Sequence, residues 1–133
     1  MLRGLATISY WTDDLEAAKA WYAEFLGIEP YFGVGDGYAE FRIGDYEHEF
    51  GLINRKYAPE GDSTTAGGTI AYWAVDDLDA TLARLISLGA TQHQPPTVRG
   101  DGFVTASVID PFGNILGVMT NVHYFDILAR DQA

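Results

Sequence analysis

The sequence predicts an α+β fold made of two tandem β-α-β-β-β modules. Two stretches repeat one order of features: alternating β-forming residues, an acidic pair followed by leucine, an apolar helical pattern and a closing Leu-Gly pair. Trp11 and Trp73 are separated by 62 positions, and so are Gly27 and Gly89. A constant offset of this kind indicates a duplicated unit. The 133 residues suffice for a single domain that contains both halves.

The first module covers about residues 4–57 and begins with a short alternating strand. Asp13 then caps a helix, because its carboxylate can accept from free N–H groups and complements the helix dipole. Apolar residues recur along this helix at three- and four-residue spacing: Leu15, Ala18, Trp21, Tyr22, Phe25 and Leu26. Gly27 supplies a left-handed C-cap. Three strand-like segments follow, at residues 30–34, 38–43 and 46–53.

The second module covers about residues 68–121 and repeats this order. Asp76 is the expected helix cap and Gly89 the expected left-handed C-cap. The apolar positions of the second helix have the same helical spacing: Leu78, Leu82, Leu85 and Ile86. The strand-like segments that follow are residues 91–98, 104–109 and 115–120.

Two segments lie outside the modules. Residues 58–67 are rich in turn-forming residues and lack periodicity, so they are the expected linker. The C-terminal segment, residues 122–133, has apolar residues at positions 124, 127 and 128. This pattern predicts either a short helix with Tyr124, Ile127 and Leu128 on one side, or a cover over the edge of the sheet.

Composition excludes several function classes. The chain has 8 Lys and Arg against 19 Asp and Glu, and its formal net charge is −11. A surface of this sign repels phosphate backbones, so nucleic acid is not an expected partner. The chain has no cysteine, which excludes disulfides, thiolate catalysis and iron–sulfur clusters. No long apolar run indicates a signal peptide or a membrane span, and we expect a cytoplasmic protein without a membrane partner.

The duplicated order, together with Asp-Pro-Phe-Gly-Asn at residues 110–114, resembles the vicinal oxygen chelate superfamily over about residues 5–121. This superfamily includes glyoxalase I, extradiol dioxygenases, fosfomycin-resistance enzymes and bleomycin-resistance proteins. The resemblance implies the glyoxalase/bleomycin-resistance fold, in which two curled mixed sheets surround a cleft. It also implies a homodimer, in which two chains often complete the cleft. The fold does not determine the chemistry, because one scaffold accommodates many different sites.

Enzymes of this superfamily hold a divalent metal with side chains from the first and last strands of each module. The matching positions in this chain are Thr7, Gly51, Thr69 and Gly117. None is a usual ligand, because catalytic metal sites need imidazole or carboxylate groups. We therefore expect neither a metal nor another cofactor.

The other candidate ligands are two glutamates and three histidines. Period-two alternation places Glu47 and Glu49 on the strand face of Gly51, where either carboxylate can reach a cleft or remain a solvated surface charge. His48 then points to the opposite face. His93 and His123 have no metal-ligand spacing to another histidine. An alternative metal site is therefore not expected.

A cleft that Thr7 and Thr69 face would also receive Trp11 and Trp73, because alternate residues of a strand share one face. Indole rings stack on planar ligands, although the two tryptophans can equally fill space between the modules. The candidate ligand-binding residues share these expected faces or their flanks: Thr7, Ser9, Trp11, Phe32, Tyr38, Glu49, Thr69, Trp73, Phe103, Thr105, Ser107 and Met119. Glycine at positions 51 and 117 leaves room for an extended ligand.

Two tyrosines and a glycine-rich hairpin lie close to the expected cleft. Tyr10 and Tyr72 alternate with the tryptophans, so we expect them to pack against the helices. The hairpin at residues 33–37 contains three glycines, and it can either flex over a cleft or form an ordinary turn.

These observations favour a metal-independent protein that binds a small molecule. The resemblance suggests sequestration of a planar aromatic or peptide-like natural product, as in antibiotic resistance, and the acidic composition favours cationic ligands. The alternative is a lyase, isomerase or hydrolase that uses Glu49 as a general base. A third possibility is an accessory module whose cleft binds nothing.

Overall fold

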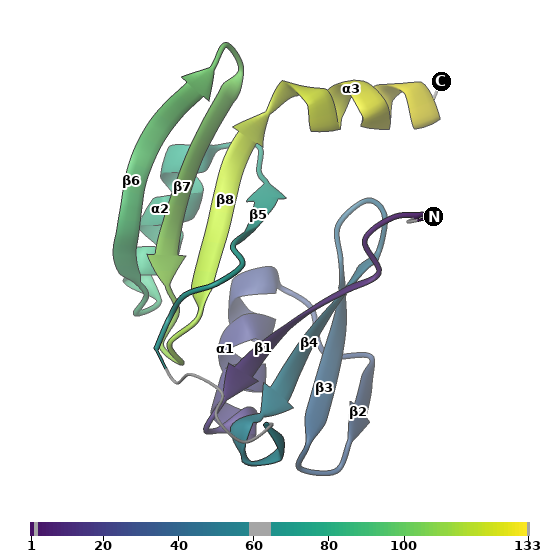
Figure 1. The fold of residues 1–133 in the computed structure, drawn as a ribbon, viewed down its shortest axis with the longest axis vertical. Helices are drawn as coiled ribbons and strands as arrows, with labels where there is room; N and C mark the ends of the chain where they lie inside the picture. The colour runs from purple at the N-terminus through teal and green to yellow at the C-terminus, as the bar shows by residue number, and fades with distance from the viewer. Residues whose placement is uncertain (2, 59–64, 133) are drawn as a thin grey trace. The chain divides into compact units, whose positions relative to one another are not determined.

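The computed structural model describes residues 1, 3–58 and 65–132, which form two compact units that divide after residue 64. Each unit is one β-α-β-β-β module, so the predicted duplication is confirmed (Figure 1). Residues 59–64 of the expected linker lie outside the described residues. The two units are described separately below.

The first unit contains a mixed sheet of four strands in the order β1-β4-β3-β2. Strand β1 runs parallel to β4, and the other neighbours are antiparallel. The elements are β1 (Thr7–Thr12), α1 (Leu15–Leu26), β2 (Phe32–Val34), β3 (Tyr38–Ile43), β4 (His48–Asn54) and the 3-10 helix η1 (Arg55–Tyr57). The predicted strands are confirmed to within two residues at each end.

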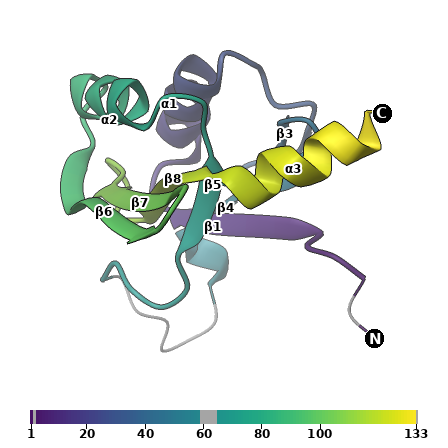
Figure 2. The same cartoon turned by 90° about the horizontal axis from the view of Figure 1, so that it is seen from above.

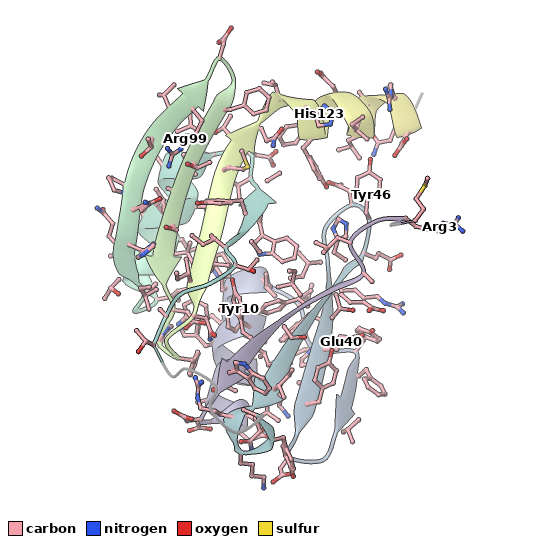
Figure 3. The ribbon with its side chains drawn as sticks, viewed as in Figure 1. Arg3, Tyr10, Glu40, Tyr46, Arg99 and His123 are labelled. Carbon is pink, nitrogen blue, oxygen red and sulfur yellow. The ribbon has the colours of Figure 1, made fainter. Side chains whose placement is uncertain are left out.

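An aromatic cluster joins α1 to one face of the first sheet. Tyr22 of α1 lies 4.9 Å from Phe50 of β4, measured between ring centroids, and Tyr10 of β1 lies 5.3 Å from Phe50 with its edge toward that ring. Edge-to-face contacts add stability beyond the apolar area that they bury. Tyr10, labelled in Figure 3, therefore packs on the helix side of the sheet as predicted.

The acidic pairs cap the helices one residue later than predicted. Asp14, not Asp13, is the N-cap of α1, and its carboxylate accepts from the backbone N–H of Ala17 at 3.0 Å. In the second unit Asp77, not Asp76, has this role. Asp14 and Asp77 both have extended backbone and lie three residues before the N–H from which they accept, as an N-cap does.

The two helices end differently. Gly27 is the left-handed C-cap of α1, with φ of 72°. Leu88 is the C-cap of α2, and Gly89 follows it with φ of 105°. Glycine tolerates this conformation because it lacks a Cβ atom.

The second unit repeats the sheet in the order β5-β8-β7-β6. Its elements are β5 (Ala71–Ala74), α2 (Leu78–Ser87), β6 (Thr91–Gly100), β7 (Phe103–Ile109), β8 (Ile115–Asn121) and α3 (Val122–Asp131). One face of the sheet is apolar and buried, formed by Ala106, Val108, Leu116 and Val118. Leu85 of α2 is fully buried in the same core.

The C-terminal segment forms a helix, α3, which confirms the first of its two predicted alternatives. It continues from the end of β8 as a separate rod (Figures 1 and 2). Tyr124, Ile127 and Leu128 are half-buried, whereas most other residues of α3 are exposed. No helix in the described ranges is long and apolar enough to cross a membrane.

Residues 110–114 form the tight turn between β7 and β8. The Asp110 carboxylate is 3% exposed and accepts from the backbone N–H groups of Phe112 and Asn114, at 2.9 and 2.8 Å. The side-chain amide of Asn114 donates to the same carboxylate at 3.1 Å. The motif that carried the family resemblance is therefore a structural turn, which fixes the register of the two strands that it joins.

Candidate functional site

The face of the first sheet that lies opposite α1 carries most of the polar residues of that sheet, and we call it the first open face. Its register forms three rows across the strands: Thr7, Glu49 and Arg42; Ser9, Gly51, Glu40 and Phe32; and Trp11, Ile53, Tyr38 and Val34. Six predicted ligand-binding residues therefore share this face: Thr7, Ser9, Trp11, Phe32, Tyr38 and Glu49.

Two carboxylates on neighbouring strands occupy the centre of the first open face. Glu40 of β3 (Figure 3) and Glu49 of β4 are diagonal neighbours in the register. The hydroxyl of Tyr38 donates to Glu40 at 2.5 Å, and the hydroxyl of Thr7 donates to Glu49 at 2.6 Å. The two acidic groups are thus held in place by hydroxyl donors on the same face.

Proximity and burial alter the acidity of this cluster. Burial raises the pKa of Glu40, the negative charge of Glu49 raises it further, and the positive charge of Arg42 opposes both effects. Burial likewise raises the pKa of Tyr38, while a hydrogen bond with Ser9 opposes the shift. Glu40 consequently holds a proton to a higher pH than an ordinary glutamate does.

We expect Glu40→Gln to stabilise the chain at neutral pH, by on the order of 0.5 kcal/mol, because it removes a like-charge neighbour of Glu49. Folding raises the pKa of Glu40 above its ordinary value of 4.5, so its protonated form stabilises the folded chain at a pH below 4.5. This stabilisation is lost as the pH rises through the pKa that Glu40 has in the folded chain. The advantage of the glutamine variant should therefore disappear on acidification. Urea unfolding from pH 4 to pH 8 measures it.

Glu47→Gln is the matched control, because Glu47 lies in the turn before β4 and outside the rows of the first open face. Its stability difference from the wild type should not follow the same pH course. An equal pH course in both variants would contradict the role of the Glu40 and Glu49 pair.

Tyr38 occupies the space that glycine was expected to leave free. A Cβ atom added to Gly51 would lie 2.5 Å from the hydroxyl oxygen of Tyr38. The expectation of an open space for a ligand at this position is therefore wrong. The absence of a side chain at position 51 instead allows the phenol ring to lie across β4 and reach Glu40.

The corresponding face of the second sheet, the second open face, contains Gly117. Its residues alternate with the apolar face described above: Tyr72, Ala74, Phe103, Thr105, Ser107, Gly117 and Met119. Phe103, Thr105, Ser107 and Met119 thus share one face with Gly117, as their alternation predicted. A Cβ atom on Gly117 would lie 2.6 Å from the carbonyl oxygen of Ala71 and 2.6 Å from the Tyr72 ring, so no free space exists here either.

The predicted position of Trp73 is wrong. Trp73 pairs with Val118 and lies on the apolar face, whereas Tyr72 pairs with Gly117 on the second open face. The prediction that Tyr72 packs on the helix side is wrong for the same reason. Strand β5 begins only at Ala71, so Thr69 precedes the strand and does not set its alternation. Trp11 and Trp73 therefore do not form a symmetric pair.

The positions that hold a metal in the superfamily do not fit one here. The hydroxyl of Thr7 is engaged with Glu49, and tyrosine rings cover Gly51 and Gly117. Within the described ranges, no group of three or more His, Asp or Glu side chains could hold a metal ion. Glu47 has φ of 51° and precedes β4, so its predicted place on the strand is wrong.

The glycine-rich hairpin is fastened at its tip. Asp36 pairs with Lys56 and accepts from the hydroxyl of Tyr57 at 2.8 Å, and these two hydrogen bonds lower the pKa of Asp36. The side-chain amide of Asn54 donates to the backbone carbonyl of Asp36 at 2.9 Å. These contacts favour the ordinary turn over a flexible flap.

Glu40 is the site residue that sequence reasoning missed. The segment 38–43 was recognised as a strand, and its alternation already places Tyr38, Glu40 and Arg42 on one face. Glu40 was not among the predicted residues, because its strand holds none of the positions that match the metal ligands of the family.

Comparison with known proteins identifies the family. The model of the Glyoxalase/Bleomycin resistance protein/Dioxygenase superfamily matches residues 4–118, and no curated protein matches the chain. Similar solved structures include a glyoxalase-related enzyme from Fulvimarina pelagi, with a TM-score of 0.72 and 20% identity over 91% of this chain and 90% of that chain. A lactoylglutathione lyase from Agrobacterium tumefaciens has a TM-score of 0.69 and 20% identity over 90% and 94% of the two chains.

A bleomycin resistance determinant encoded on the transposon Tn5 has a TM-score of 0.63 and 21% identity over 90% of this chain and 98% of that chain. At such identities these structures share the fold alone. The family match covers most of the sequence, and it agrees with the paired modules and with the turn at residues 110–114. The chain therefore belongs to the glyoxalase/bleomycin resistance protein/dioxygenase superfamily.

Proposed function

We propose that this chain binds a planar, positively charged small molecule on its first open face without a metal. The observation that carries the proposal is the pair of carboxylates, Glu40 and Glu49, held on one sheet face among aromatic side chains. Their charge supplies attraction for a cation, and the rings supply flat apolar area.

The electrostatic part of the proposal follows from the sheet register. Arg42 is the cation nearest to both carboxylates in the rows, and its guanidinium lies 4.3 Å from the centre of the Tyr31 ring. The net charge of −11 makes the surroundings acidic as well. A cationic ligand would relieve the repulsion between Glu40 and Glu49, so its binding gains more than it would from a single carboxylate.

The aromatic part of the proposal rests on three rings of the same face. Phe32 and Tyr38 lie 6.4 Å apart between centroids, in an edge-to-face arrangement, and Phe32 is half exposed. Trp11 lies in the same row as Tyr38, with Ile53 between them. Covering these rings with a planar molecule removes apolar surface from water, which favours binding.

The family supports binding as a function in itself. One structural neighbour is a bleomycin resistance determinant, which favours a binding protein of the antibiotic-resistance type. Other neighbours have the names of enzymes, and this chain lacks the ligand residues of the metal-dependent members at positions 7, 51, 69 and 117. Of the two tryptophans expected to stack on a ligand, Trp11 lies on the first open face, whereas Trp73 lies on the apolar face of the second sheet.

Calorimetric titration of chelator-treated protein with proflavine, a planar cation, tests the proposal. We expect saturable binding, with affinity lowered about tenfold or more in the double variant Glu40→Gln and Glu49→Gln, because charge-assisted contacts are lost. Trp11→Ala should also weaken binding. Acridone, a neutral planar compound, should bind less tightly to the wild type than proflavine does.

Glu47→Gln and Trp21→Ala are the matched controls, because they make the same kinds of change away from the first open face. Equal affinity in the double variant and in the Glu47→Gln control would refute the carboxylate site. Equal binding of acridone and proflavine would refute the preference for a cation.

Proton transfer is the second candidate function, and the raised pKa of Glu40 favours it. The enzyme hypothesis drawn from the sequence uses Glu49 as the general base. Glu40 is the better candidate for that role, because its pKa is raised. In this case Glu40 would take a proton from a bound carbon acid and later return one. Deuterium uptake from heavy water into a bound compound, abolished by Glu40→Gln, would favour an enzyme, whereas recovery of the unlabelled compound would favour binding alone.

A further inference from the structure

The edge strand β6 of the second sheet pairs irregularly with β7. Gln92 faces Val108 and Gln94 faces Ser107, so His93 is an extra residue between two paired positions. The same happens near the end of the strand, where Arg99 is the extra residue between Val98 and Gly100. Such bulges change the direction of a side chain, and they are common beside functional sites.

A third irregularity lies between Gln94 and Thr97. His93 and Arg99 both turn toward the second open face. Nδ1 of His93 lies 2.8 Å from the hydroxyl oxygen of Ser107, and Nε of Arg99 donates to the hydroxyl of Thr105 at 3.0 Å. Ser107 is fully buried and Thr105 nearly so. Arg99 lies over β6 and β7 in Figure 3. Two exposed basic side chains are therefore fixed by buried hydroxyl groups of one strand.

The donors that remain on these side chains have no acidic partner among the described residues. Lys19, Arg55 and Lys56 form ion pairs with described carboxylates, whereas Arg99 forms none. Its bond to Thr105 uses Nε, so the two terminal nitrogens still carry donors.

His93 can present a donor of the same kind. When the Ser107 hydroxyl donates to Nδ1, the neutral imidazole carries its proton on Nε2, on the far side of the ring. Thr105 and Ser107 are two residues apart on one strand, which places the two anchoring oxygens about 7 Å from each other. An oxyanion that lay between the two side chains would accept from both, through hydrogen bonds of about 2.9 Å.

We propose that His93 and Arg99 form a binding subsite for an oxyanion, such as a carboxylate or a phosphate group, on the second open face. The bulges of β6 aim the two side chains, and the hydroxyls of Ser107 and Thr105 hold them. The subsite goes beyond the proposed function, which uses the carboxylates of the first open face. The two sheets would thus recognise groups of opposite charge.

Nuclear magnetic resonance of the isotopically labelled chain tests the subsite with two probes, benzoate and inorganic phosphate, titrated separately. We expect saturable shifts of the Arg99 Nε–H signal and of the His93 ring signals with at least one probe. Arg99→Gln should raise the Kd about tenfold, because one charge-assisted interaction is lost. Thr105→Val retains the charge but removes the anchor, and it should weaken binding less.

Arg130→Gln is the matched control, since Arg130 is an exposed arginine of the last turn of α3 and the variant makes the same change in net charge. Its Kd should stay within twofold of the wild type. Equal weakening by Arg99→Gln and Arg130→Gln would mean general attraction of anions and would overturn the subsite. The absence of saturable shifts at His93 and Arg99 with both probes would also overturn it, whatever the result with proflavine. A response to benzoate but not phosphate would identify a carboxylate subsite, and the reverse a phosphate subsite.

Discussion

Replacement of Gly117 by alanine is expected to lower the free energy of unfolding by about 2–3 kcal/mol, as overpacking in a rigid core does. The new Cβ atom would lie 2.6 Å from the carbonyl oxygen of Ala71, which belongs to the backbone of the neighbouring strand. A backbone carbonyl cannot relieve the contact by changing rotamer, as a side chain can, so β5 and β8 must move apart. Gly51→Ala should cost less, about 1 kcal/mol, because the atom nearest to its Cβ belongs to the mobile end of Tyr38.

Urea unfolding of both variants measures this difference, with Gly4→Ala as the control. A Cβ atom on Gly4 would have no neighbour within 4 Å, so that variant should unfold like the wild type. If Gly117→Ala were as stable as the control, the close pairing of β5 with β8 would be wrong.

Asp110→Ala is expected to cost about 3 kcal/mol, because it removes a buried carboxylate that accepts three hydrogen bonds. The amide groups of Phe112 and Asn114 would lose their partner inside the turn. Asp110→Asn keeps the shape and one acceptor oxygen, so its cost should be smaller, about 1 kcal/mol. Thermal unfolding and the hydrogen exchange of the Asn114 amide measure the two effects.

Asp101 lies exposed in the neighbouring turn between β6 and β7, and Asp101→Ala is the matched control. This control should leave the melting temperature nearly unchanged. A similar loss in Asp101→Ala and Asp110→Ala would indicate that net charge, and not the turn, determines the stability.

The elements of the fold were predictable because their signals are local. The spacing of Leu15, Ala18 and Tyr22 indicates a helix by itself, and these three residues are the buried ones of α1. The alternation of segment 38–43 likewise indicates a strand. The choice of cap failed in both helices, where Asp14 and Asp77 were used in place of Asp13 and Asp76. Neighbouring aspartates are equally suitable as caps by residue type, and the backbone conformation decides which one is used.

The candidate site was predictable only in part, because it depends on pairing between distant segments. Nothing within residues 69–74 shows that β5 begins at Ala71, and this start places Tyr72, not Trp73, beside Gly117. The bulges that aim His93 and Arg99 depend in the same way on the partner strand β7. A register shift of one residue moves a side chain to the other face of the sheet.

The phenol ring of Tyr38 above Gly51 also limits how this chain can evolve. A single mutation that placed glutamate at position 51 would drive its Cβ atom into the Tyr38 hydroxyl and disturb the bond to Glu40. Either the Tyr38 ring must then move aside or a smaller residue must replace it, and both changes remove the hydroxyl that holds Glu40. A metal ligand at this position would therefore cost the chain the hydroxyl contact that holds Glu40, so the two arrangements exclude each other.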